Sequence, residues 1–290
     1  MSADTTDPSK ELEELGRKFR NHKTDDKARV VVGLAEVIGV DQSSPEYLEI
    51  LSLINRRLLA LEGLLGELDN SEISKELKKD VVGAARSFMQ LVGPAQAFGL
   101  WNEVKKNLLS DTNLTALRWF SQTARKHRPL RMIPKEEVAG ALQAVDSALD
   151  GLLAERSLPI WVQSVLIDGL NRTRFVLQWL PYFGHEIAIL ELLAVNQKAV
   201  SALSDLNAAG QCKGVSVTKF FNALLVAGGL FILPDQAVTA FDKYRGWTQR
   251  SIEGLINDAE QRKQQTLLLP SPAALAPREE QLEDGAESDK

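Results

Sequence analysis

The residues best suited to chemistry are charged side chains that lie inside otherwise apolar segments. Arg172 and Arg174 belong to a predicted helix over residues 158–180, and Glu191 interrupts the aliphatic residues of another over 185–209. A buried charge needs a partner of opposite sign, so we expect Glu191 to pair across helices with Arg172 or Arg174. We prefer a structural ion pair as the interpretation, and keep a charged groove that binds a small ligand or carries catalysis as the alternative.

Histidine and cysteine do not form a recognisable site in the sequence. His185-Glu186 begins like the zinc motif His-Glu-x-x-His, but residue 189 is Ile189, so the second ligand is missing. There is no Gly-rich phosphate loop and no Gly-x-Ser-x-Gly nucleophile elbow. His185 is expected to be structural, at the start of a helix, and stays a candidate ligand or partner residue. We therefore predict no metal and no cofactor, and favour a non-enzymatic protein over an enzyme.

A basic cluster follows at the end of a predicted helix. It comprises Arg125, Lys126, His127, Arg128 and Arg131. Positive charge at a helix C-terminus offsets the helix dipole, so a solvated helix end is the simplest interpretation. The functional alternative is contact with phosphate, lipid headgroups or an acidic partner. An intermediate hypothesis is that the acidic C-terminal residues fold back over the cluster.

The most apolar segment lies over residues 215–234. A run of 14 residues, Phe220 to Leu233, is interrupted by Asn222. Crossing a hydrocarbon core takes about 20 apolar residues, so this run predicts a central core helix first and a membrane-inserting segment second. The side chains that would enter a membrane are Phe220, Phe221, Leu224, Leu225, Leu230 and Phe231.

Helical periodicity dominates the rest of the chain. Ser44 and Pro45 form a helix start, and apolar residues then follow from Tyr47 to Leu68 at 4-3-4-3-4-3 spacing, which is a coiled-coil-like seam. A short polar turn and a second apolar stripe, Ile73 to Leu91, predict an antiparallel helical hairpin over residues 45–92.

The predicted fold is an all-α multi-helix bundle of about ten helices. We expect a disordered N-terminus over 1–8 and an N-terminal bundle over 9–128. A C-terminal bundle over 129–265, with apolar helix 215–233, and a disordered acidic tail over 266–290 follow. The 290 residues suffice for one large domain or two smaller ones.

Charge and cysteine content narrow the class of partner. The net charge is −5, but residues 279–290 hold six acids and one base, which leaves 33 bases and 33 acids elsewhere. A neutral body makes nucleic acid an unlikely partner. A single cysteine, Cys212, and no secretory signal favour a cytoplasmic protein, with a location at a membrane surface as the alternative.

These observations rank the functions without identifying one. We expect a non-enzymatic helical protein–protein interaction module of the adaptor or scaffold type, with another protein as its partner. The first alternative is a membrane-associating helical protein that uses residues 215–234. The second is a small-ligand binder or enzyme with a charged groove between helices 158–180 and 185–209. The sequence leaves the oligomeric state open.

Overall fold

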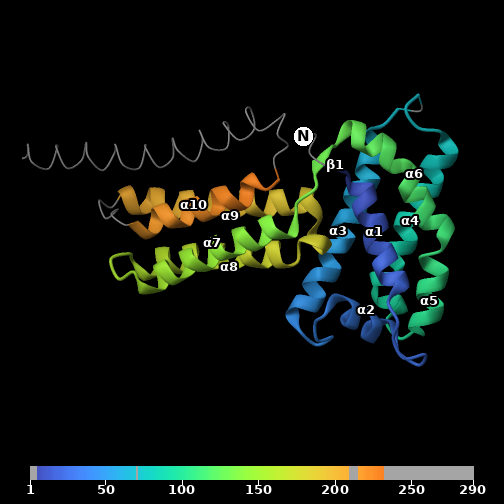
Figure 1. Cartoon of the computed structure of the whole chain (residues 1–290), viewed down its shortest axis with the longest axis horizontal. Helices are drawn as coiled ribbons and strands as arrows, with labels where there is room; N and C mark the ends of the chain where they lie inside the picture. Colours follow the sequence, from blue (N-terminus) through green and yellow to red (C-terminus); the bar gives the residue numbers. More distant parts are fainter. Residues whose placement is uncertain (1–4, 70, 209–214, 232–290) are drawn as a thin grey trace, which may run out of the picture.

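The computed structural model describes residues 5–69, 71–208 and 215–231, and this part of the chain is almost wholly helical. It contains ten α-helices, one short 3-10 helix and two strands of two residues each, so the all-α prediction is confirmed (Figure 1). The predicted tail over 266–290 and the final residues of the predicted helix 215–233 lie outside the described residues.

The first six helices pack around one core. They are α1 (Pro8–Asn21), α2 (Val30–Ile38), α3 (Pro45–Glu67), α4 (Lys75–Val92), α5 (Trp101–Leu108) and α6 (Asp111–His127), with the 3-10 helix Pro94–Gln96 between α4 and α5. Phe19, Phe88, Trp101 and Phe120 are fully buried there, and the rings of Phe19 and Phe88 meet edge to face at 5.7 Å. We call this unit the N-terminal body.

The predicted helices over 45–92 correspond to α3 and α4, which pack against each other. Ser44 caps α3 by accepting from the Tyr47 amide, as the sequence predicts. Two polar contacts join these segments, from Arg86 to Glu62 at 3.6 Å and from Lys78 to the Leu68 carbonyl at 3.3 Å. The two segments therefore run antiparallel.

The start of the chain differs from the expected disorder over residues 1–8. Thr5–Thr6 form strand β1, which pairs antiparallel with β2 (Leu130–Arg131). Asp7 is fully buried and caps α1, and its carboxylate also accepts from the Ser121 hydroxyl at 2.5 Å. A buried carboxylate needs such donors, so these contacts fix residues 5–8 against α6.

The remaining four helices form a second bundle, the C-terminal body. They are α7 (Lys135–Ala154), α8 (Ile160–Gln178), α9 (Leu180–Ala208) and α10 (Val215–Gly229). Val162, Leu166, Phe183 and Phe220 belong to its own core. Its helices run along the long axis of the molecule, whereas those of the N-terminal body run across it (Figure 1). The start of α9 packs against α1 and α3, so the first turns of α9 lie at the junction of the two bodies.

Candidate functional site

The junction is organised around a sharp kink in α9. Gly184 has φ of 66°, a left-handed conformation that side-chain-bearing residues rarely adopt. A Cβ at Gly184 would also lie 2.5 Å from Nε of Arg57, so the position requires glycine for two separate reasons. The guanidinium of Arg57 donates to the carbonyls of Pro181 and Tyr182 at 2.9 and 3.1 Å. Arg57 thus supplies hydrogen bonds to carbonyls near the interrupted helix.

Glu11 of α1 completes this buried polar centre. Its carboxylate accepts from Nη2 of Arg57 at 3.0 Å and from the backbone amide of His185 at 3.3 Å. It also contacts Nδ1 of His185, which we assign as the donor because an ionised carboxylate can only accept. The side chains of Arg57 and Glu11 are only 5 and 12% exposed. The contacts among Glu11, Arg57 and His185 therefore join three helices, α1, α3 and α9.

Burial and neighbouring charge shift the pKa values of this centre in opposite directions. Burial by itself raises the pKa of Glu11, but the hydrogen bond from His185 and the positive charge of Arg57 outweigh it, so the pKa is lowered. Burial lowers the pKa of Arg57 despite the attraction of Glu11. An arginine stays protonated at any physiological pH, so the centre is an ion pair in the folded protein.

A cleft of about 560 Å³ opens beside this centre, between α1, the segment leading into α7, and the α8–α9 connection. Its walls are mainly apolar and include Leu15, Met132, Val138 and Leu177. Met132 is 39% exposed at this surface. This junction cleft therefore offers apolar surface contributed by both bodies.

Two lysines stand at the junction cleft. Lys18 donates to the Tyr182 hydroxyl at 2.6 Å and lies 4.7 Å from the centre of that ring, and partial burial lowers its pKa. Lys135 begins α7 and is exposed. Among the described residues, neither lysine has a carboxylate within ion-pair distance. Glu14, which also lines the cleft, is paired with Lys10 at 3.8 Å. The available charge at the cleft is therefore positive.

The structure places the four candidate ligand or partner residues in three different environments. These residues are Arg172, Arg174, His185 and Glu191. Arg172 pairs with Glu191 at 2.8 Å, as expected, and also contacts Glu49 of α3. Glu191 in turn pairs with Arg56 at 2.9 Å. Hydrogen bonds and the charges of both arginines lower the pKa of Glu191, although burial opposes them. This ion network ties α8 and α9 to α3.

The other two candidates lie elsewhere. Arg174 is 3.4 Å from Asp146 of α7 and does not contact Glu191. His185 alone of the four lines the junction cleft. Its Nε2 atom is buried without a hydrogen-bond partner, beside the ring of Phe231. Of the four candidates only His185 therefore lines this cleft, together with polar residues from α1, α7 and α8.

Most of the basic cluster is already neutralised within the molecule. Arg128 contacts both Glu67 and Glu186, and Arg131 pairs with Glu137 at 2.8 Å. Arg125 is 3.5 Å from the Asp7 carboxylate, and His127 is 3.1 Å from that of Glu72. No ion pair of Lys126 is found among the described residues. The cluster therefore holds α6 and β2 against neighbouring elements.

The apolar segment belongs to the core of the C-terminal body. Phe220, Phe221, Leu224, Leu230 and Phe231 are buried, and Leu225 is half-buried. They pack chiefly against α7, α8 and α9. Among the described residues, no helix combines the length and apolarity needed to cross a bilayer. Insertion of these side chains into lipid would require the bundle to open.

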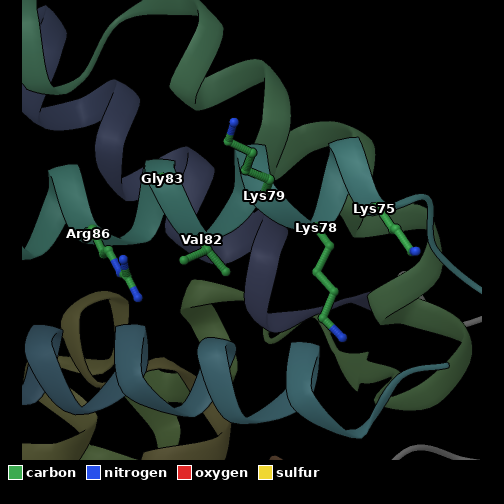
Figure 2. Close-up of a pocket in the computed structure, with 6 residues that line it drawn as sticks. All are labelled: Lys75, Lys78, Lys79, Val82, Gly83 and Arg86. Atoms are coloured by element: carbon green, nitrogen blue, oxygen red, sulfur yellow. The ribbon is translucent and has the colours of Figure 1, made fainter. Parts of the chain in front are cut away.

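Sequence reasoning missed two groups of residues. One is Arg57 with Glu11: Arg57 lies in the apolar row Ile50, Leu53 and Leu64 of α3, where a charge signals a buried partner. The other is a surface groove on α4, here the α4 groove, lined by Lys75, Lys78, Lys79, Val82, Gly83 and Arg86 (Figure 2). A sequence pattern could have predicted this groove. Four of its residues follow one another at 4-3-4 spacing, the spacing of an apolar helix stripe: Lys75, Lys79, Val82 and Arg86.

The described residues contain no group of three or more His, Cys, Asp or Glu side chains that could hold a metal ion. No protein-family model matches the chain, and neither a curated protein nor a solved structure matches it at a significant level.

Proposed function

We propose that this protein is a non-enzymatic helical interaction module that binds a short segment of a partner protein in the junction cleft. The observation that carries the proposal is the cleft of about 560 Å³ with apolar walls from both bodies and an exposed Met132. Concave apolar surface with a few convergent polar groups is typical of binding sites. A partner that filled the cleft would remove this surface from water.

The charges at the cleft indicate the chemistry of the partner. Lys18 and Lys135 have no acidic partner among the described residues, whereas Glu11 and Glu14 are both paired within the chain. A partner segment with an apolar side chain next to one or two carboxylates would satisfy both features. Charge complementarity of this kind favours specificity and the rate of association.

The buried centre supports the proposal by holding the cleft in shape. Arg57, Glu11 and His185 connect α1, α3 and α9 directly behind it. A preorganised cleft loses little conformational freedom on binding, so more of the contact energy contributes to affinity.

The test uses peptide display on the full chain. Random peptides are selected on the immobilised protein, and the affinity of enriched sequences is measured by fluorescence anisotropy. We expect enriched peptides to combine apolar and acidic residues and to bind at least about tenfold more weakly to Lys18→Glu. Lys106→Glu, at an exposed lysine of α5 remote from the cleft lining, is the matched control and should bind as the parent does.

Equal binding to the Lys18→Glu variant and the parent would refute the assignment of the cleft. A second candidate function is small-ligand binding, since about 560 Å³ also falls in the range of small-molecule sites. A medium-chain fatty acid that binds the parent and loses affinity in Lys18→Glu, with no enriched peptide, would favour this second function.

A further inference from the structure

The α4 groove differs from the basic cluster at Arg125 to Arg131 because most of its cations have no carboxylate partner among the described residues. Lys75 and Lys79 have no ion pair among the described residues, and the Lys78 amine donates to a backbone carbonyl. Arg86 pairs with Glu62 at 3.6 Å, but its side chain is 70% exposed. In the basic cluster Arg125 to Arg131, by contrast, carboxylates contact all three arginines.

The position of these lysines within α4 is electrostatically unfavourable. Lys75, Lys78 and Lys79 occupy the first two turns of the helix, where the helix dipole is positive. Lys75 and Lys78 are three residues apart and project to the same side of α4 (Figure 2), so they also repel one another. An anion in the groove would relieve both effects.

The groove also has open space and an apolar floor. A Cβ placed on Gly83 would meet no atom within 4 Å, and Val82 lies between Lys78 and Arg86 on the same face (Figure 2). Figure 2 shows Lys75, Lys78 and Arg86 projecting to one side of α4 and Lys79 to the other. An extended anionic chain with an occasional apolar residue fits such a surface.

We propose that the acidic segment 279–289 of this same chain occupies the α4 groove. The segment carries six acids, with one large apolar residue, Leu282, among them, and the groove offers Val82 between its cations. The charge elsewhere in the chain is balanced, so this segment accounts for the net negative charge of the chain. Charge complementarity between this acidic segment and the lysines of α4 is therefore the reason for assigning it to the groove. The α4 groove is distinct from the junction cleft.

The geometry places the groove within reach. Leu230 accepts from Arg131 at 3.3 Å, and His127, four residues earlier, pairs with Glu72, three residues before Lys75. The end of the described chain and the segment that leads into α4 thus both contact residues 127–131. Residues 232–278 then separate Phe231 from the acidic segment, and 47 residues span about 70 Å even when wholly helical. Tethering within one chain raises the effective concentration of the acidic segment at the groove.

The test is zero-length carbodiimide cross-linking of the full chain, which joins a carboxylate to a lysine amine only when they touch. Digestion and mass spectrometry then identify the linked peptides. We expect peptides from 279–290 to be linked to Lys75, Lys78 or Lys79 at least about tenfold more than to the exposed control Lys106. These links should fall about tenfold in 1 M salt, where the Debye length is about 3 Å.

Two further measurements make the result decisive. A variant in which all six acids of 279–289 become amides should show faster acetylation of Lys75 and Lys79, with no change at Lys106. An equal mixture of isotope-labelled and unlabelled protein should give links within single chains only. Links that go mainly to Lys126, mixed-isotope links, or unchanged acetylation of Lys75 and Lys79 would each overturn the proposal.

Discussion

Neighbouring arginines on α3 provide a direct test of what the buried centre contributes. Arg57 is only 5% exposed and holds Glu11 together with two backbone carbonyls. Arg56 is 46% exposed, and its partner Glu191 keeps a second cation, Arg172, when Arg56 is removed. Replacing either arginine by methionine keeps an apolar stem and deletes one charge, so the two variants differ mainly in burial.

The expected magnitudes follow from that difference. Arg57→Met leaves Glu11 without its cation and two carbonyls without a donor, and breaking a buried pair in this way lowers the free energy of unfolding by about 3–5 kcal/mol. Arg56→Met removes an exposed pair and should lower it by about 0–1 kcal/mol. With an unfolding entropy of about 2.1 cal/mol/K per residue over 290 residues, these losses correspond to a fall in Tm of about 5–8 °C and at most about 2 °C respectively.

The assay is urea and thermal unfolding followed by circular dichroism at neutral pH. The double variant Glu11→Gln with Arg57→Met should lose less stability than the sum of the two single variants, because the uncompensated charge is then gone. A loss for Arg57→Met that equals the loss for Arg56→Met would refute the reasoning. Additive effects of Glu11→Gln and Arg57→Met would show that the two side chains are not coupled.

Two further predictions follow from the packing and from burial. Gly83→Ala should stabilise the fold by about 0.5–1 kcal/mol, because its Cβ meets open space and alanine is the better helix former, whereas Gly33→Ala should destabilise it by about 1–3 kcal/mol. The reason at Gly33 is a Cβ only 2.4 Å from the fully buried Trp101 ring, and paired urea unfolding curves with opposite shifts are the check. Burial raises the pKa of Tyr47 and of Tyr182 to about 12, above the ordinary 10.0, so the fold is unaffected by these groups below pH 10 and loses stability as the pH rises from 10 towards 12. Tyrosinate absorbance should show two of the three tyrosines titrating near pH 12 in the folded protein, and titration of all three near pH 10 before unfolding would contradict this.

The local pattern of the sequence determines where helices begin and which faces they bury. Ser44-Pro45 predicts the start of α3, and the 4-3 spacing that follows identifies Tyr47, Ile54 and Leu58 as core residues, all of which are buried. Asp7 caps α1 by the same local rule, but its second carboxylate oxygen contacts Ser121 and Arg125, more than a hundred residues away. Capping and periodicity are near-neighbour effects, so a single sequence contains most of the information they need.

The sequence predicts only part of the ion pairing. It anticipated that Glu191 needs an arginine, because a charge inside an apolar helix has few other solutions. It could not choose between Arg172 and Arg174, since the two differ only in which neighbouring helix they face. The fold pairs Arg172 with Glu191 and directs Arg174 to Asp146.

The sequence by itself determined an all-α chain and the apolar faces of its helices. The tertiary structure alone decided which charges are neutralised and which are left to meet a partner. The basic cluster at 125–131 looked available in sequence, yet Asp7, Glu67 and Glu186 approach it from other elements. The cations at Lys75 and Lys79 drew no attention, yet they have no ion pair in the part of the chain that the structure describes. Helix formation depends on residues a few positions apart, whereas charge neutralisation depends on how distant helices pack.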